Sequence, residues 1–248
     1  LAPATHPGSP CHRLGRAFVR IFGVEEQARP IPVHTGSLWH FSQTEIKHLT
    51  QATLAFTIAL AFMFSHGIRG ALSDTNAFAL HAFIGLLTFT PGFLIHEIAH
   101  KVQARKYGCW AEFRASPSGL RFGVILAALI GVVFMAPGAV MVAGNTTKEQ
   151  FGKVALAGPV SNVVLWCIGL LCAVTLGGSG GLSDVLIYYW MFANGILGAL
   201  NMLPFGPLDG KKIRTWSRPV FWIWLIICLS MVWFNFTQLD SLLVLGTQ

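Results

Sequence analysis

Long stretches without charged side chains constrain the fold of this chain more than any other feature. They cover residues 49–65, 78–95, 122–144, 154–183, 185–208 and 219–239. A helix needs about 20 predominantly apolar residues to cross the hydrocarbon core of a bilayer. Charged residues make up only 11% of the chain, against about 25% in an ordinary soluble domain. The sequence therefore predicts an all-α polytopic membrane protein and excludes a soluble globular fold.

The distribution of Lys and Arg predicts how these segments cross the membrane. Basic residues are dense before residue 49, across 101–121 and across 204–218, and sparse between 66 and 77. Cytoplasmic loops of membrane proteins carry such an excess. All three dense regions lie on the cytoplasmic side only if 122–144 enters the membrane and returns on the same side. Pro137 and Gly138 suit a turn there, and β structure buried against protein is permitted at membrane depth. We therefore expect five to six transmembrane helices with a re-entrant β-hairpin at 122–144.

The same pattern divides the chain into three parts. We expect an N-terminal cytoplasmic arm at residues 1–40, a membrane-embedded core at 41–218 and an additional C-terminal transmembrane helix at 219–248. The net charge of +7 comes from basic clusters between apolar runs, so it indicates membrane topology rather than nucleic-acid binding. Membrane lipid is the expected surrounding partner, and no nucleic acid is expected.

His96, Glu97 and His100 form an H-E-x-x-H pattern after the second apolar run. Positions i and i+4 of a helix share one face, so both imidazoles can bind one metal ion. Zinc accepts two imidazole nitrogens and a carboxylate and keeps one position for water. Zinc lowers the pKa of that water to about 7, and Glu97 can accept its proton. Ionisable residues inside a membrane are costly and usually functional, so a metal site is favoured over a polar helix face.

A catalytic zinc needs a third protein ligand, and few candidates exist. Asp74 and Asp184 lie in loops with few basic residues, and Asp240 lies at the far end of the chain. Asp209 lies in the segment NMLPFGPLDGKK (201–212), where two prolines break the preceding helix. The residues alone leave two interpretations open. Asp209 is either a metal ligand turned toward the histidines or a loop aspartate paired with the neighbouring lysines.

Three motifs together make the sequence recognisable. HEIAH (96–100), AGPVSN (157–162) and NMLPFGPLDG (201–210) occur in this order. The combination resembles the site-2 protease family of intramembrane zinc metalloproteases, and it looks most like archaeal members. The resemblance covers about residues 41 to 212, which makes the core at 41–218 an intramembrane metalloprotease core.

The resemblance implies a role for each motif residue. His96, His100 and Asp209 would bind one Zn²⁺ per chain, and Glu97 would be the general base. Asn201 matches the family asparagine that steadies the substrate carbonyl or its oxyanion, as an amide N–H directed at developing negative charge can do. A hydrogen bond between helices is the alternative role for Asn201. That alternative is stronger for Asn162, which we take as a supporting residue.

The function implied is that of a zinc-dependent intramembrane endopeptidase. It would hydrolyse peptide bonds in or near transmembrane helices of substrate proteins, in the cell membrane, with its active site toward the cytoplasmic side. A strand edge in 122–144 could pair with an unwound substrate segment. Two alternatives use the same residues: a transporter that moves a metal ion, and a non-catalytic protein that binds membrane proteins.

Overall fold

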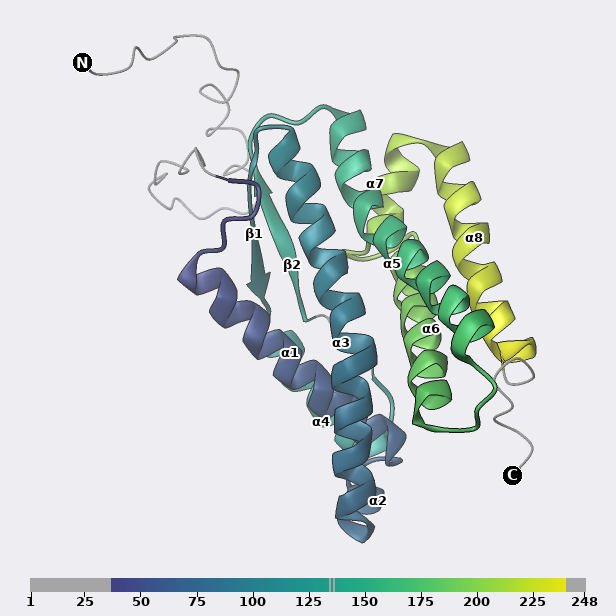
Figure 1. Ribbon diagram of the computed structural model, residues 1–248. Coiled ribbons are helices and arrows are strands. Elements are labelled where there is room, and N and C mark those ends of the chain that lie inside the picture. Colours follow the sequence, from purple (N-terminus) through teal and green to yellow (C-terminus); the bar gives the residue numbers. More distant parts are fainter. Residues whose placement is uncertain (1–36, 134, 136, 240–248) are drawn as a thin grey trace.

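The computed structural model describes residues 37–239, except residues 134 and 136. Most of the predicted arm (1–40) and the end of the predicted C-terminal part (240–248) therefore lie outside the described residues. Within the described part, four helices are long and apolar enough to cross a membrane: α1 (Gln43–Phe64), α3 (Thr75–Lys106), α5 (Lys148–Leu176) and α8 (Arg218–Thr237). Figure 1 shows α3, α5 and α8 side by side, with α1 crossing α3 obliquely. The protein is a mostly helical membrane protein.

The remaining helices are shorter or less apolar. They are α2 (Ile68–Ser73), α4 (Pro117–Ile130), α6 (Leu182–Asn201) and α7 (Asp209–Trp216). Helix α6 occupies the expected span at 185–208 but ends at Asn201, and it is not among the four candidate spans. The count of five to six spans therefore stays a prediction.

Polar side chains cap the N-termini of α3 and α5, the two helices that carry the HEIAH and AGPVSN motifs. Asp74 caps α3 by accepting a hydrogen bond from the backbone N–H of Ala77, at 2.8 Å. Thr147 caps α5 by accepting from the N–H of Gln150, whose side chain accepts from the N–H of Thr147 in return. Such capping satisfies donors that the first helical turn leaves unpaired. Both long helices therefore have defined starting points.

The β structure differs from the expected hairpin. Strand β2 (Gly138–Ala143) lies in the predicted segment, but residues 122–130 belong to helix α4. The partner of β2 is β1 (Trp110–Ala115), paired antiparallel with Trp110 opposite Ala143 and Ala115 opposite Gly138. The hairpin within 122–144 is therefore wrong, because an apolar run of this length fits a buried strand or a buried helix equally well. Helix α4 connects the two strands.

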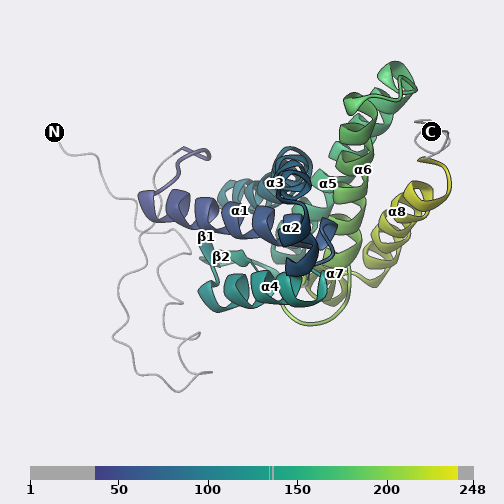
Figure 2. The ribbon, with the colours of Figure 1, turned by 90° about the horizontal axis from the view of Figure 1, so that it is seen from below.

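The sheet lies against α3, the helix that carries His96 and His100. Figure 2 shows α1 on one side of the sheet and α4 on the other. The outer edge of β1 is covered by α1: the N–H of Phe113 donates to Glu45 Oε1 at 3.0 Å, and that of Ala115 donates to His48 Nδ1 at 3.4 Å. The second carboxylate oxygen of Glu45 pairs with the buried Lys101 of α3. One buried ion pair thus connects α1, α3 and β1.

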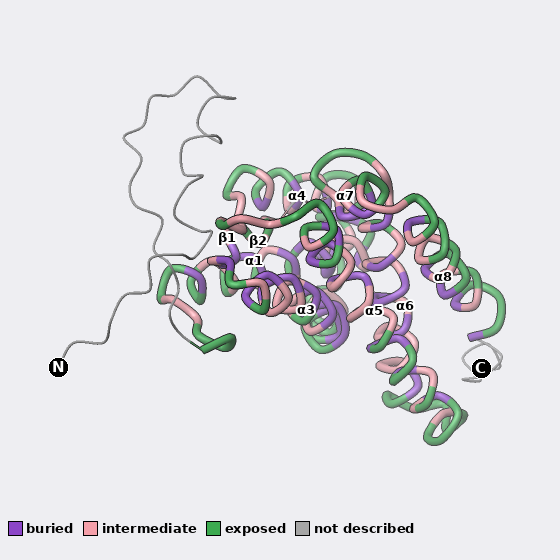
Figure 3. Tube along the Cα trace, turned by 90° about the horizontal axis from the view of Figure 1, so that it is seen from above, coloured by how far each residue is buried: buried purple, intermediate pink, exposed green. Residues whose placement is uncertain are grey.

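The burial pattern fits a helical bundle in lipid. Figure 3 shows buried residues gathered where α3, α5 and α6 face one another, and exposed residues on their outward faces. Many of the exposed side chains are large and apolar, among them Leu171 and Val174 of α5 and Ile226 and Trp233 of α8. An exposed apolar surface of this kind suits contact with acyl chains rather than water. The polar residues of the motifs lie on the inner side.

Candidate metal centre

Helix α3 places His96 and His100 on one buried face. Their rings lie one turn apart in an edge-to-face arrangement, with the two Nε2 atoms 3.0 Å from each other. The exposed fraction is 3% for His96 and 7% for His100. Both imidazoles therefore lie on one face of α3, as the i, i+4 spacing predicts, because successive turns of a helix bring such positions one above the other.

Asp209 is brought to the histidines by the chain that follows α6. It is the first residue of α7, and Oδ2 lies 2.9 Å from His100 Nε2 and 3.3 Å from His96 Nε2. Its other oxygen, Oδ1, accepts from Lys212 Nζ at 2.9 Å. Both interpretations of Asp209 are thus realised, one by each carboxylate oxygen. Gly210 permits the tight approach, because a Cβ there would lie 2.1 Å from the Met202 carbonyl oxygen.

The charge state of Asp209 suits a ligand. Burial alone would raise its pKa, but His100, His96 and Lys212 beside it hold the pKa of this carboxyl well below its usual range. A carboxylate must be deprotonated to bind a metal. Its position in the first turn of α7 adds the favourable end of the helix dipole.

The three donor atoms fit a zinc ion. His96, His100 and Asp209 each offer one ligand atom, and these atoms all lie within 4.8 Å of one another. Bonds of about 2.0–2.1 Å to one tetrahedral centre place neighbouring donors about 3.3 Å apart. The separations of 2.9, 3.0 and 3.3 Å are close to that value. Two imidazoles and one carboxylate also match the donor set of catalytic zinc sites.

The second nitrogen of each histidine is held by another helix. His96 Nδ1 lies 2.6 Å from Asn162 Oδ1, and His100 Nδ1 lies 2.7 Å from the carbonyl oxygen of Val154. An oxygen accepts only from a protonated nitrogen, so each Nδ1 carries the hydrogen and each Nε2 keeps its lone pair for a metal. Such partners fix the tautomer and the ring orientation of metal-binding histidines. Both partners come from α5.

Asn162 belongs to a buried chain of amides. Its Nδ2 donates to the carbonyl of Gly92 at 3.3 Å and to Asn194 Oδ1 at 3.0 Å. Asn194 in turn donates to the carbonyl of Trp190 at 2.9 Å. Asn162 and Asn194 are both 0% exposed. The network therefore joins α3, α5 and α6 and holds the Asn162 oxygen toward His96.

Gly158 explains how α5 comes so near to the histidines. A Cβ at this position would lie 2.5 Å from His96 Nε2 and 2.5 Å from His100 Nε2. That is closer than any side chain permits, so the backbone itself forms one wall of the site.

Glu97 lies beside the cluster and contacts the sheet. Its carboxylate accepts a hydrogen bond from the backbone N–H of Val140 in β2 and is within electrostatic range of His96, Asp209 and Lys212. Val140 lies directly opposite Phe113, whose backbone N–H points to Glu45 and therefore away from β2. Two residues directly opposite each other in an antiparallel pair either both bond across the ladder or both point away from it. The backbone N–H of Val140 therefore points away from β1, and the free edge of β2 faces Glu97.

The other candidate residues lie elsewhere. Asn201 ends α6, and its amide donates to the carbonyl of Leu197 at 3.0 Å. Among the described contacts, none joins Asn201 to the cluster. Asp74 caps α3, and Asp184 accepts from the N–H of Gly180 at 2.6 Å. Both are thus structural in the described part of the chain, while Asp240 lies outside it.

Comparison with known proteins decides the family. The chain is 38% identical over 203 residues to "Putative zinc metalloprotease MJ0611" of Methanocaldococcus jannaschii, covering 79% of this chain and 95% of that protein. The chain belongs to the site-2 protease family of zinc metalloproteases. Two further relatives are also named putative zinc metalloproteases. Rip3 of Mycobacterium tuberculosis is 31% identical over 52% of this chain and 29% of its own length. YwhC of Bacillus subtilis is 30% identical over 52% of this chain and 66% of its own length. No family model and no solved structure matches the chain.

Within this member of the site-2 protease family, sequence reasoning missed two supports of the site, Asn194 and the Val154 carbonyl. Gly158 of the AGPVSN motif is a position where close helix packing is expected from the sequence, and it shares a helix face with Asn162, four residues on. The Val154 carbonyl carries no sequence signal, since every residue has one.

Proposed function

We propose that this chain is a zinc-dependent intramembrane endopeptidase that hydrolyses peptide bonds in or near transmembrane helices of substrate proteins. The observation that carries the proposal is the convergence of His96 Nε2, His100 Nε2 and Asp209 Oδ2 at the end of a helix long enough to cross a membrane. Family membership supports the same chemistry.

Three residues hold the metal and one handles the proton. His96, His100 and Asp209 bind a single Zn²⁺, with α5 fixing the two imidazoles. Zinc, when bound, lowers the pKa of a water molecule to about 7 and polarises the substrate carbonyl. Glu97 accepts the proton of the attacking water and passes it to the leaving amine. Its position beside the ligand His96, without binding the metal itself, suits that role.

Asn201 is the proposed donor to the substrate carbonyl. Its amide nitrogen carries two hydrogens, and one is committed to the carbonyl of Leu197. The other remains available to stabilise the oxygen as negative charge develops. The support for this role is the N-x-x-P-x-x-P-L-D-G motif, since Asn201 begins the segment that ends in the ligand Asp209.

The edge of β2 is the proposed substrate track. A peptide bond within a helix is shielded by its own hydrogen bonds, so the substrate must unwind before hydrolysis. An unwound segment can add to a sheet edge as a further strand. The edge of β1 is occupied by Glu45 and His48 of α1, whereas that of β2 faces Glu97. A segment added there lies beside the general base.

The site is proposed to face the cytoplasm of the cell. Helix α3 ends with Arg105 and Lys106, and α7 carries Lys211, Lys212 and Arg214. Basic residues at the ends of spans are typical of the cytoplasmic side. The histidines are then inside the membrane yet near a water supply.

Cleavage by purified protein tests the proposal. The substrate is a tagged single-span membrane protein in liposomes, and the variant is Glu97→Gln. We expect the wild type to cut it, and the variant to lose at least about 10²–10⁴-fold in rate, the usual contribution of a general base. The variant should keep one zinc per chain, because Glu97 is not a ligand.

Two outcomes would contradict the proposal. Equal cleavage by wild type and variant would remove Glu97 from the mechanism. Zinc passing across the liposome membrane, with no peptide product from a panel of single-span proteins, would favour the metal-ion transporter instead. A chelator is the control, since it should abolish cleavage by the wild type.

A further inference from the structure

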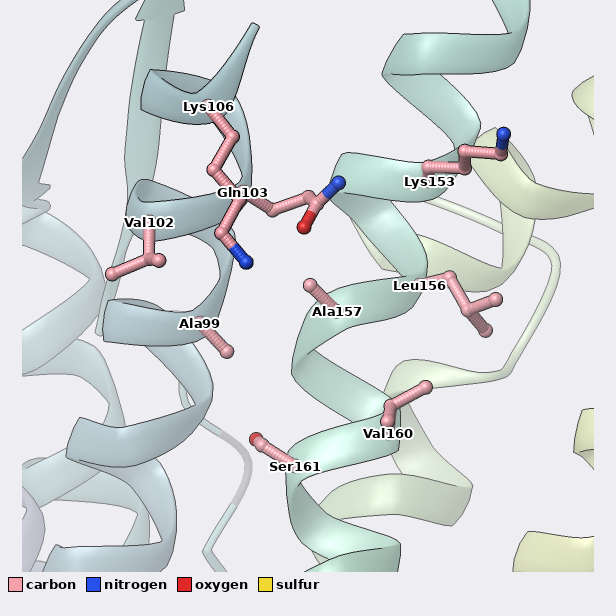
Figure 4. A pocket seen from close by; sticks show the side chains of 9 residues that line it. All are labelled: Ala99, Val102, Gln103, Lys106, Lys153, Leu156, Ala157, Val160 and Ser161. Atoms are coloured by element: carbon pink, nitrogen blue, oxygen red, sulfur yellow. The ribbon is translucent and has the colours of Figure 1, made fainter. Parts of the chain in front are cut away.

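A groove on the outer side of the contact between α3 and α5 has no part in the proposed chemistry. It has a volume of about 430 Å³ and is lined from both helices by Ala99, Val102, Gln103, Lys106, Lys153, Leu156, Ala157, Val160 and Ser161. That volume is within the usual range for ligand sites, about 300–1,000 Å³. Figure 4 shows the small side chains of Ala99, Ala157 and Ser161 in its lower part.

The two ends of the groove differ in chemistry. Apolar and small side chains line the part that runs along the spans, whereas Lys106 and Lys153 stand at the rim where α3 ends and α5 begins. In Figure 4 the Gln103 side chain extends from α3 toward α5, whereas the Lys153 side chain, which also lines the groove, extends from α5 away from α3. A ligand that fits both ends carries a negative head and an apolar tail.

The charges at the rim are available for such a ligand. Among the described residues, those that line the groove include no acidic side chain. Lys153 pairs with Glu149 at 2.6 Å, but both side chains are largely exposed to solvent, so this pair contributes little and exchanges readily. Within the described part of the chain, Lys106 has no ion-pair partner. Tyr107, next to it, is an aromatic residue of the kind enriched at headgroup level.

We propose that this groove binds an anionic phospholipid, with the phosphate at Lys106 and Lys153 and one acyl chain between α3 and α5. Basic pockets between transmembrane helices on the cytoplasmic side bind anionic headgroups in this manner. A lipid was chosen over a protein helix because the polar and apolar parts of the groove follow the order of headgroup and acyl chain.

The position of the groove gives the lipid a consequence for the metal centre. Its wall residues Ala157 and Ser161 precede Gly158 and Asn162 in the sequence by one position each, so the groove lies on the face of α5 that adjoins the face contacting the two histidines. A bound acyl chain fills the outer gap of the same helix pair whose inner contact orients the imidazoles. The bound lipid therefore stabilises the separation of α3 and α5.

Native mass spectrometry of the full chain in detergent tests the binding, with phosphatidylglycerol and phosphatidylcholine as competing probes. We expect wild type to retain phosphatidylglycerol preferentially. The double variant Lys106→Gln/Lys153→Gln should bind it about tenfold more weakly, since each basic residue near a headgroup adds to the attraction. The control is Lys148→Gln, which removes one positive charge from an exposed position of α5 outside the groove and is compared with each of the single variants Lys106→Gln and Lys153→Gln.

A second variant keeps the lysines and fills the groove. Ala99→Leu should weaken retention of phosphatidylglycerol while the helical circular dichroism stays unchanged. Equal retention of the two lipids by wild type would overturn the proposal, as would equal losses in Lys148→Gln and the single variants. Cross-linking through the groove to a second copy of this chain, or to a substrate helix, would overturn it too. None of these measurements depends on peptide hydrolysis, so they stand apart from the test of the protease.

Discussion

At the scale of single residues, the backbone at position 158 comes nearer to the metal centre than a side chain could. Gly158→Ala would place a methyl group 2.5 Å from both Nε2 atoms. Overpacking of this kind costs about 1–3 kcal/mol, which is about 5- to 150-fold in zinc affinity. We expect zinc affinity to fall by that factor, as measured by competition with a chromogenic chelator.

The control is Gly181→Ala. Its new Cβ would meet only Ser179 Oγ, at 3.6 Å, so zinc affinity should not change. Wild-type zinc affinity in Gly158→Ala would show that α5 does not approach the histidines as described.

The residues of the site differ in how far the sequence alone could predict them. His96 and His100 are polar residues in a long apolar helix, where polarity is costly, so they were predictable as a pair. Asp209 was predicted as their partner only through the motif resemblance, and the structure brings the three together. Asn162 was predicted only as a supporting residue, because an asparagine in a membrane helix is usually a contact between helices. In the structure Asn162 makes such a contact, to Asn194 of α6, and is also the hydrogen-bond partner of His96.

At the scale of elements, the edge of β2 can be tested without disturbing the ladder to β1. Val142 has the same parity as Val140, so its N–H points away from β1. Val142→Pro removes that donor, and proline is tolerated at the edge of a sheet. We expect cleavage of the single-span substrate to fall at least about tenfold, in line with the loss of a hydrogen bond near 1 kcal/mol and a displaced strand, with zinc content unchanged.

The matched variant is Val142→Ala, which trims the side chain but retains the N–H. It should cleave at a rate near that of wild type. If Val142→Pro cleaves as well as Val142→Ala, substrate does not pair with this edge.

Elements were less predictable than residues in this chain. Strand β1 carries Glu112 and Arg114, so its sequence resembles a cytoplasmic loop. Its pairing with β2 depends on α4 returning the chain, which no local pattern indicates. Residues 122–130 contain no polar side chain, so they show no hydrophobic periodicity that would distinguish a helix from a strand. The turn expected at Pro137 and Gly138 is also wrong, because Gly138 begins β2 and the chain between the strands runs through α4.

At the scale of the whole molecule, the proposed metal centre joins parts of the chain that are distant in sequence. The proposed ligands come from α3 and α7, and the hydrogen-bond partners of the histidines come from α5. A ligand that binds only the folded state stabilises it by about 4 kcal/mol when its free concentration is a thousand times its Kd. We therefore expect a chelator to lower the Tm of the purified protein by several degrees, as followed by circular dichroism.

His100→Ala separates this effect from a general action of the chelator. The variant should unfold at a lower Tm than wild type, and the chelator should lower that Tm no further. An unchanged Tm in chelator-treated wild type would mean that the three segments hold together without the metal.

If substrate adds to the edge of β2 as proposed, the small sheet also determines how many substrate segments one chain can hold. One of its edges is used by Glu45 and His48, so only the edge beside Glu97 is left for a guest strand. Binding through that edge is then limited to one segment per chain at a time. Competing membrane segments would inhibit one another competitively, and a short extended peptide without a cleavable bond would act as an inhibitor by occupying the same place.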